Sequence, residues 1–286
     1  MQRQKSFENG RCTLYLVPTP IGNLNEMTPR AIEVLNSVDV IACEDTRTSG
    51  TLLKHFGIRK KLIACQNFNE ANSAKGIAAL LEQGLNVALI SDAGYPLISD
   101  PGQRVVDEVT SAGYNVVPLS GPNAMLNALV ASGLIVQPFV FIGFLPASVS
   151  ECRSKLQMYR DYPMTMVFYE APHRIVKMLS TVLEVLGDRK CCIAREITKI
   201  HEEFLRGTVS ELLEAMKEEA RGEMVVIIEG KTGETVISED TIRETVGKYL
   251  AQGMRTSSAV KEAAKELGLN KNRVYDLVHE KEDEAV

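Results

Sequence analysis

Charged and polar residues directly follow several apolar runs of this sequence, where folding can gather them for chemistry. Four such segments lie in the first half of the chain and two in the second half: residues 18–24, 44–47, 91–102, 120–124, 169–174 and 195–199. Glu170, Lys199 and Asp45 are candidates for accepting a proton, since a carboxylate or an amine of lowered pKa can act as a base. Arg195 is a candidate for orienting a phosphate.

The residue types in these segments restrict the ligand. None of the segments contains GxGxxG, the glycine pattern of dinucleotide-binding folds. A site made of backbone groups, Asp92 and small residues suits a small neutral or zwitterionic nucleoside better than a triphosphate. Two simpler interpretations stay open in the second half: Arg195 and Glu196 can pair with each other, and His173 can cap a helix.

The first half of the chain alternates apolar runs with helix-like segments. Strands are predicted at 14–18, 38–43, 62–65, 87–90 and 116–119, and helices at 29–37, 49–56, 73–83, 102–112 and 123–132. The strands are continuously apolar, which is typical of a parallel sheet covered by helices on both faces. The polar segments then lie at the carboxyl edge of that sheet, where open α/β sheets bind ligands.

The second half predicts a mixed α/β domain. Its strands are expected at 139–144, 164–169, 191–195, 201–206 and 224–229, and its helices at 152–159, 174–186 and 209–220. Only one helix separates the last three strands, which favours some antiparallel pairing. Residues 231–240 resemble a linker. The fold class is therefore α/β, with domains at 1–132, 133–235 and 236–286.

The last domain is predicted to be all helix over 241–279 and has the form of a helix-turn-helix. Small Ala263 permits close helix crossing, Gly268 makes the turn, and Val274, Leu277 and Val278 anchor the second helix. Asn270 is expected to cap that helix. Lys271, Asn272 and Arg273 stand at its start, where such modules contact nucleic acid. The alternative is a helical hairpin used only for packing.

Charge is unevenly distributed along the 286 residues, whose net charge is −5. Residues 241–279 hold seven Lys or Arg and four Asp or Glu, whereas residues 280–286 hold one Lys and four acidic residues. The total excludes indiscriminate coating of a polyanion, but it leaves room for focused binding to RNA. Residues 109–150 carry no charge and are interrupted by proline and glycine, which favours a core or subunit interface over a membrane span.

Cysteine and histidine usage argues against a metal site. The six cysteines show no CxxC spacing and the four histidines no HxxxH spacing, so no metal is expected. A membrane is not expected as a partner either, because residues 109–150 are interrupted by proline and glycine. The amino-terminal residues lack the apolar region of a signal peptide, so a cytoplasmic location is predicted.

At the segments above, the chain resembles the tetrapyrrole methylase superfamily and, within it, the bacterial ribosomal RNA small subunit methyltransferase I family. The resemblance covers about residues 13–230, extends to the helical tail, and is carried by long motifs in a fixed order: the segment from Pro18, EDTR at 44–47, SDAG at 91–94, ISDPG at 98–102, FLP at 144–146, FYE at 168–170 with PHR at 172–174, and RE at 195–196 with TK at 198–199. It implies two α/β domains with S-adenosylmethionine in a cleft between them. It also implies a homodimer that methylates the 2′-oxygen of a cytidine ribose in the decoding region of 16S rRNA.

The resemblance also implies where the cofactor binds. The matching positions are Pro20, Ile21, Gly22, Asp92, Ala93, Gly94, Tyr95, Asn123, Ala124, Tyr169, Ala194, Glu223 and Met224. The chain departs from the family at 65–69, where CQNFN replaces a pattern with two histidines, so neither histidine can be an obligatory base here. Two alternatives remain: a methyltransferase acting on a small tetrapyrrole, and a ligand-sensing regulator that binds DNA through its helix-turn-helix.

Overall fold

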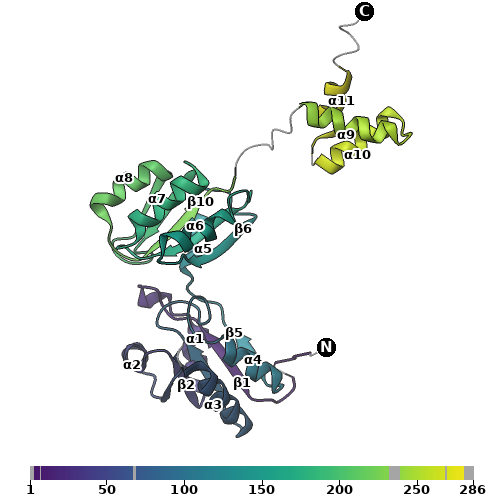
Figure 1. Cartoon of the computed structure of the whole chain (residues 1–286). Coiled ribbons are helices and arrows are strands. Elements are labelled where there is room, and N and C mark those ends of the chain that lie inside the picture. Colours follow the sequence, from purple (N-terminus) through teal and green to yellow (C-terminus); the bar gives the residue numbers. More distant parts are fainter. Residues whose placement is uncertain (1–2, 7, 67–68, 232–238, 268, 280–286) are drawn as a thin grey trace, which may run out of the picture. The chain divides into compact units, whose positions relative to one another are not determined.

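The computed structural model describes residues 3–6, 8–66, 69–231, 239–267 and 269–279. Contacts between residues divide the chain into two units, 1–231 and 232–286. The first unit contains two five-stranded sheets, coloured purple to blue and teal to green in Figure 1. We call the parts built on these sheets the first lobe and the second lobe. Within the described ranges, no helix is both long enough and apolar enough to cross a lipid bilayer.

The first lobe has a parallel sheet, as its apolar runs predict. Its strands are β1 (Thr13–Val17), β2 (Val40–Cys43), β3 (Lys61–Ala64), β4 (Val87–Ile90) and β5 (Asn115–Pro118). They lie in the order β3-β2-β4-β1-β5, and every described pairing is parallel. All five carboxyl ends therefore meet at one edge, which confirms the predicted arrangement of the loops that follow them.

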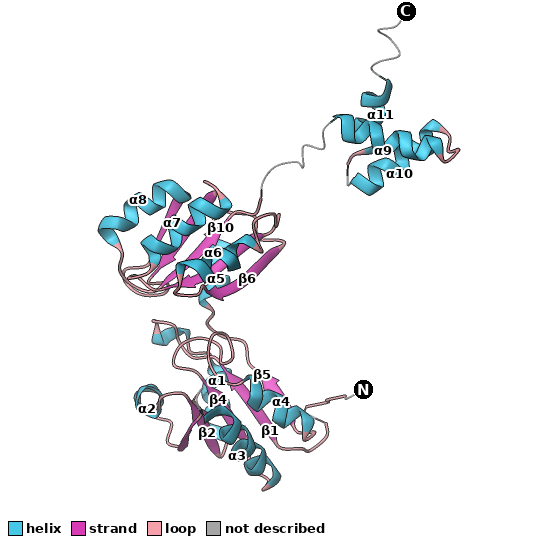
Figure 2. Ribbon diagram, viewed as in Figure 1, coloured by secondary structure: helices cyan, strands magenta, loops and turns pink. Residues whose placement is uncertain are grey.

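Helices cover both faces of this sheet (Figure 2). The helices are α1 (Pro29–Ser37), α2 (Thr46–His55), α3 (Glu70–Glu82) and α4 (Gln103–Ser111), with a short 3-10 helix, η1, at Leu24–Glu26. Side chains of a strand alternate between faces, so Ile41 and Ile90 pack with α1 and α2, whereas Val40 and Leu89 pack with α3 and α4. Burial on both faces explains why these strands are apolar throughout.

Helix starts in this lobe depend on local and on distant caps. The Thr28 hydroxyl accepts from Ala31 N at 3.1 Å, which confirms the predicted start of α1. Helix α2 begins three residues earlier than predicted because Asp45 caps it. Helix α4 follows Gly102, which has no side chain, and the cap comes from α3: Glu70 Oε1 accepts from Gly102 N at 2.8 Å and from Arg104 N at 2.9 Å.

The second lobe has a mixed sheet, which also confirms the prediction. Its strands are β6 (Phe139–Phe144), β7 (Thr165–Glu170), β8 (Lys190–Arg195), β9 (Glu203–Thr208) and β10 (Met224–Ile228). The order is β6-β7-β10-β8-β9; β6 and β7 are parallel, and the other neighbours are antiparallel. Because β10 runs opposite to β7 and β8, its first residues lie at the edge where those strands end.

Helix α5 (Ala124–Ala131) follows the first lobe in the chain but packs on the second sheet. Helices α6 (Val149–Gln157), α7 (Ile175–Leu186) and α8 (Val209–Glu219) pack on one face of the second sheet. The other face packs against α5, whose Ala128 and Leu129 are buried with Ala194 and Val225, and against the half-buried Ile21. A division at residue 132 assigns α5 to the first domain, whereas its packing assigns it to the second lobe.

The second unit is a small helical bundle. It contains α9 (Glu239–Ala251), α10 (Thr256–Leu267) and α11 (Lys271–His279), so the all-helix prediction holds for the described residues. Its core includes Val246, Ala263 and Val274. Asn270 Oδ1 accepts from Asn272 N at 2.9 Å, which confirms the predicted cap. The predicted turn at Gly268 and the expected boundary at 235 lie outside the described residues.

Gly230 allows a close backbone contact at the end of the first unit, and this contact gives a stability prediction. A Cβ built on it would lie 2.2 Å from the Pro163 carbonyl oxygen, which belongs to backbone and cannot swing away. We expect Gly230→Ala to lower the free energy of unfolding in urea by at least about 2 kcal/mol. Gly76→Ala is the control: Gly76 lies in α3 with open space around it, so alanine should raise stability by about 0.5–1 kcal/mol. Equal effects of the two substitutions would contradict this account.

Candidate active site

A pocket of about 400 Å³ lies where the strand ends of the two lobes meet. The first lobe supplies loops that follow β1, β4 and β5, and the second lobe supplies the ends of β6 and β7, the loop after β8 and the start of β10. The lining residues are Ile21, Asp92, Ala93, Gly94, Tyr95, Ile98, Ser99, Asp100, Asn123, Ala124, Phe144, Tyr169, Glu170, Ala171, Pro172, Glu196, Ile197, Lys199, Glu223, Met224 and Val225.

Hydrogen bonds between loops hold the first-lobe side of the pocket. Thr19 and Gly94 exchange two backbone bonds, of 2.9 and 3.0 Å. The hydroxyl of Thr19 donates to Ser91 O, and the hydroxyl of Ser91 donates to Gly94 O. The loop after β1 is thereby fixed to the loop after β4. Tyr95 extends the network, since its hydroxyl accepts from Gly121 N at 3.0 Å in the loop after β5.

Left-handed backbone occurs on both sides of the pocket. Leu97 and Ser99 have φ of 73° and 70° in the loop after β4, and Glu196 and Thr198 have φ of 52° and 69° in the loop after β8. For residues other than glycine this conformation costs about 1 kcal/mol or more each. Such strain persists only where surrounding contacts fix it, and here it bends both loops toward the pocket.

Gly22 and Lys199 bring the two lobes into close contact. A Cβ on Gly22 would lie 2.5 Å from Lys199 Cγ and 3.1 Å from Thr198 Oγ1, so the lysine stem crosses directly over the glycine. The Lys199 ammonium is 2.9 Å from Glu196 Oε1, and this hydrogen bond lowers the pKa of Glu196. The absence of a side chain at Gly22 therefore leaves room for Lys199, which pairs with Glu196.

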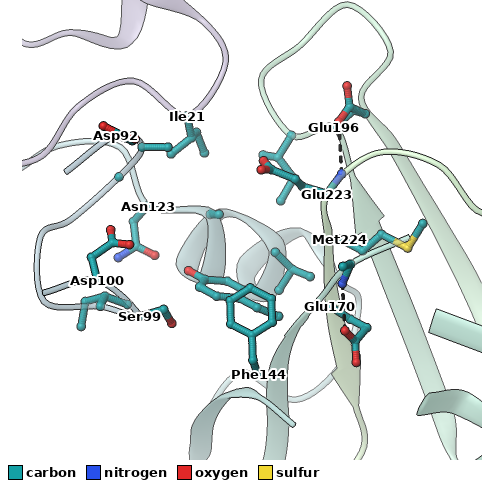
Figure 3. A pocket seen from close by; sticks show the side chains of 18 of the residues that line it. Ile21, Asp92, Ser99, Asp100, Asn123, Phe144, Glu170, Glu196, Glu223 and Met224 are labelled. Atoms are coloured by element: carbon teal, nitrogen blue, oxygen red, sulfur yellow. Dashed lines mark hydrogen bonds between the residues drawn. The ribbon is translucent and has the colours of Figure 1, made fainter. Parts of the chain in front are cut away.

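Acidic side chains outnumber basic ones in the pocket lining. Figure 3 shows Asp92 and Asp100 on the first-lobe side and Glu196 and Glu223 on the second-lobe side, with Glu170 beyond them. Against these five carboxylates, the described lining contains one lysine, Lys199, and no arginine. The pocket is suited to a positively charged ligand.

Burial and mutual repulsion alter how these carboxyl groups ionise. Burial, followed by the charges of Glu44 and Asp92, raises the pKa of Asp100 to about 6. Burial likewise raises the pKa of Glu170, whose side chain is 1% exposed. Glu170 Oε1 accepts from Ala171 N at 2.9 Å and lies 3.2 Å from Arg174 Nε. Glu170 is thus held rigidly at the pocket edge.

Aromatic rings form the apolar part of the lining. The ring of Tyr169 meets Phe141 and Phe144 edge to face, with centroids 5.0 and 5.6 Å apart. Phe144 is 53% exposed although it is large and apolar, and it stands at the pocket mouth in Figure 3. Burial raises the pKa of Tyr169, so its hydroxyl keeps its proton. An exposed ring over a pocket offers a flat surface for a planar group.

The lining contains most of the expected cofactor positions. Ten of them line the pocket: Ile21, Asp92, Ala93, Gly94, Tyr95, Asn123, Ala124, Tyr169, Glu223 and Met224. Pro20 is buried, and Ala194 is fully buried within β8, where it packs in the core beneath the pocket. Gly22 contacts Lys199 rather than the pocket itself.

The four candidate catalytic residues separate into two pairs. Glu170 and Lys199 line the pocket, whereas Asp45 and Arg195 do not. Asp45 caps α2 and binds Arg47 Nη2 at 2.8 Å; the hydrogen bonds from Arg47 lower its pKa to about 2, which makes it a poor base.

Arg195 is 7% exposed and pairs with acidic side chains of the second lobe. Its guanidinium binds the carboxylates of Glu203 and Glu219 and donates to the Glu219 carbonyl at 2.6 Å. These contacts occupy part of the guanidinium, and the phosphate contact of Arg195 stays a prediction. The described contacts pair Glu196 with Lys199 rather than with Arg195.

Other lining residues were absent from the expected set: Ile98, Ser99, Asp100, Phe144, Ala171, Pro172, Glu196, Ile197 and Val225. Most of these residues lie inside or beside the motifs that carry the family resemblance. The motifs could therefore have been used to predict them as lining residues. What the sequence lacked was the bend at Leu97 and Ser99, which turns the second part of the β4 loop back into the pocket.

Two family models match this chain. Residues 13–213 match the family model described as Tetrapyrrole (Corrin/Porphyrin) Methylases, and residues 244–282 match the RsmI C-terminal HTH domain. Proteins named Ribosomal RNA small subunit methyltransferase I are 44% identical in Bacillus subtilis and 42% identical in Escherichia coli O157:H7. Each alignment covers 99% of this chain and 100% of the relative. The chain belongs to the ribosomal RNA small subunit methyltransferase I family.

Solved structures place this methyltransferase I family member in a wider fold group. A uroporphyrin-III-C-methyltransferase from Thermus thermophilus aligns with a TM-score of 0.53 at 19% identity, over 77% of this chain and 93% of that one. A putative diphthine synthase from Entamoeba histolytica aligns with a TM-score of 0.57 at 18% identity, over 78% and 94%. At these identities the likeness concerns the fold. The helix-turn-helix match agrees with the predicted form of the tail.

The tail residues expected to contact RNA are only partly described. Lys271 and Asn272 are exposed at the start of α11, and the side chain of Arg273 lies outside the described part. The described part of the chain contains no group of three or more His, Cys, Asp or Glu side chains that could hold a metal.

The raised pKa of Asp100 predicts a pH-dependent stability. The folded protein holds this proton more tightly than the unfolded chain does, so folding stability should fall as pH rises from about 4 to about 6. Asp100→Asn removes the ionisation. It should leave the free energy of unfolding nearly unchanged at pH 4 and raise it at pH 7.5 by about 1–3 kcal/mol. Urea titrations at both pH values measure this. The control is Glu108→Gln, at an exposed position on α4; a difference independent of pH would contradict the assignment.

Proposed function

We propose that this protein transfers a methyl group from S-adenosylmethionine to the 2′-hydroxyl of a cytidine ribose in the decoding region of 16S rRNA. The observation that carries the proposal is the acidic, partly aromatic pocket at the strand ends, in a chain of the ribosomal RNA small subunit methyltransferase I family. The names of the relatives support the class of substrate. The ribose position and the decoding region come from the family resemblance.

The pocket fits the cofactor in charge, shape and size. Its carboxylates complement a sulfonium cation, the rings of Tyr169 and Phe144 offer a surface for adenine, and about 400 Å³ is within the range of small-molecule sites. Ile21, the loop from Asp92 to Tyr95, and Asn123 would hold it from the first lobe, and Glu223 and Met224 from the second. When bound, the cofactor supplies an activated methyl group on a good leaving group.

The protein's own task is then to position the ribose hydroxyl and to receive its proton. A base must face the pocket and be unprotonated at neutral pH. Asp100 meets both conditions and, with a pKa of about 6, is a stronger base than an ordinary aspartate. Glu170 is fixed by Ala171 N and Arg174 and serves as a positioning group. Lys199 can hydrogen-bond the hydroxyl as a donor while Glu196 balances its charge.

Substitutions separate these roles. Methyl transfer from labelled S-adenosylmethionine to isolated small subunits should fall at least about 100-fold in Asp100→Asn, if it is the base. Glu170→Gln and Lys199→Met should lower transfer less, about 10-fold, through misplacement of the ribose. Lys199→Met should leave cofactor affinity within a few-fold. In Asp100→Asn and Glu170→Gln, each of which neutralises a pocket carboxylate, methyl transfer should fall more than cofactor affinity does. Asp45→Asn, which keeps the α2 cap outside the pocket, is the control and should retain activity.

The same assay decides between the proposal and its alternatives. Labelled 2′-O-methylcytidine in the rRNA supports the proposal. Label found only in a tetrapyrrole would support the small-molecule methyltransferase. Absence of transfer, together with salt-sensitive binding to one DNA duplex, would support the regulator.

The helical unit is proposed to hold the ribosomal substrate. Replacing Lys271 and Arg273 by alanine should weaken binding to small subunits. It should also reduce the slope of log affinity against log salt by about 0.7 for each phosphate that the variant no longer binds. Cofactor affinity should not change. Lys248→Ala is the control, because Lys248 is an exposed lysine of the same unit that is paired with Glu266. Unchanged RNA affinity in the double variant would leave the unit as a packing module.

We also propose that the protein is a cytoplasmic homodimer. Large apolar side chains are exposed on α5 and on the segment after it, with Val130 70%, Ile135 63% and Leu126 44% exposed. Such a patch suits a second copy of the chain. Sedimentation equilibrium should give twice the mass of the chain, and Val130→Glu should shift it toward the monomer.

A further inference from the structure

A second cavity, which we call the basic cavity, shares a wall with the cofactor pocket. Its volume is about 300 Å³, and its described lining belongs to the second lobe. Residues 170–174, which connect β7 to α7, form the shared wall: Glu170 lines both cavities, Ala171 and Pro172 line the cofactor pocket, and His173 and Arg174 line the basic cavity. A ligand that occupies one cavity is therefore next to a ligand in the other.

The two cavities differ in charge. The basic cavity is lined by His173, Arg174 and Lys177, and Glu170 is the one carboxylate among its described lining residues. That carboxylate is almost fully buried and bonded to Ala171 N and Arg174, whereas His173 and Lys177 are exposed. The charged side chain that this cavity exposes to a ligand is therefore the cationic Lys177, and not the buried Glu170. The basic cavity thus suits an anion, while the cofactor pocket suits a cation.

Backbone contacts hold the two permanently charged groups in place. Arg174 Nε forms an ion pair with Glu170 at 3.2 Å and Nη2 donates to the Leu145 carbonyl, while the Lys177 ammonium donates to the Ala147 carbonyl at 3.2 Å. A guanidinium has five N–H donors and an ammonium has three. The contacts described for these two residues use only part of that capacity. Donors held in position and not fully used are what a phosphate requires.

We propose that the basic cavity binds a phosphodiester of the RNA strand, next to the nucleotide whose ribose is methylated. This inference rests on the proposed function. Every ribose within an RNA strand has a phosphate on each side, so a ribose placed at the cofactor pocket brings phosphates with it. Five carboxylates in that pocket repel them. The basic cavity is the adjoining hollow with the opposite charge, and it thereby orients the strand at the methyl-transfer site.

The test uses the full-length protein with Lys177→Ala as the main variant, because Lys177 is exposed and its removal leaves the buried Glu170–Arg174 pair intact. The KM for small ribosomal subunits should rise about three- to tenfold. The slope of log kcat/KM against log salt should decrease by about 0.7, the value for one phosphate contact on a single strand. The affinity for S-adenosylmethionine should remain within twofold.

Two further variants isolate the effect. His173→Ala combined with Lys177→Ala should raise the KM for RNA further, with an unchanged melting temperature as the sign that folding is intact. Lys217→Ala is the matched control, since Lys217 is an exposed lysine of the same lobe on α8, outside both cavity linings. It should leave the KM and the salt slope as in the unmodified protein. Equal values for Lys177→Ala and Lys217→Ala would overturn the proposal.

Direct binding separates this proposal from the proposed function. Anisotropy of a labelled single-stranded RNA reports the cavity even where no methyl transfer occurs. In one outcome, Lys177→Ala binds RNA more weakly while the unmodified protein transfers no methyl group. That pair of results would support the cavity as an RNA site and would reject the enzymatic function. Inorganic phosphate is the second probe. Suppose that Lys177→Ala weakens the binding of millimolar phosphate but leaves the affinity for RNA unchanged. The cavity then binds a free anion, and the RNA assignment is overturned.

Discussion

The face of the second sheet that α6, α7 and α8 leave uncovered is the constraint on which the site depends. Residues such as Val167 and Ile227 on that face are fully buried only because α5 and Ile21 pack against them. Burying such side chains is worth about 1.5–3 kcal/mol each, so the chain cannot separate these elements cheaply. The same packing sets the strand ends of the two lobes opposite each other. The pocket is thus a consequence of how the second sheet completes its core.

Charge is the second organising feature. The proposed reaction brings a cationic cofactor and an anionic strand together at one reacting atom, and a surface of uniform sign would repel one of them. The connection from β7 to α7 separates the two signs, since its first residues line the acidic pocket and its last residues line the basic cavity. Glu170 lies at the change of sign and pairs with Arg174. The net charge of −5 is therefore compatible with an RNA substrate, because the location of the charged side chains, and not their sum, determines where an anion can bind.

The sequence predicted features that depend on local patterns. The parallel order of the first sheet, the mixed second sheet and the caps at Thr28 and Asn270 depend on neighbouring residues and on the length of connections. Features set by distant partners were not predictable in this way. Glu70 caps a helix that begins more than 30 residues later in the chain. Arg195 forms ion pairs with Glu203 and Glu219. The pKa of Asp100 is raised mainly by burial, which residue spacing does not reveal. The packing of α5 on the second sheet likewise depends on residues far away in the chain, such as Ala194 and Val225.

The strained loops show why the site has to be built on a rigid frame. Leu97 and Ser99 on one side, and Glu196 and Thr198 on the other, adopt a backbone that glycine would adopt at lower cost. Glycine would also widen the range of conformations open to each loop in the unfolded chain. At one of these positions the side chain makes a contact that glycine could not make, since the Glu196 carboxylate binds Lys199. The backbone strain at Glu196 is therefore the cost of placing that carboxylate at a sharp bend. On the first-lobe side, the bonds between Thr19, Ser91 and Gly94 hold the loops that carry the other bend.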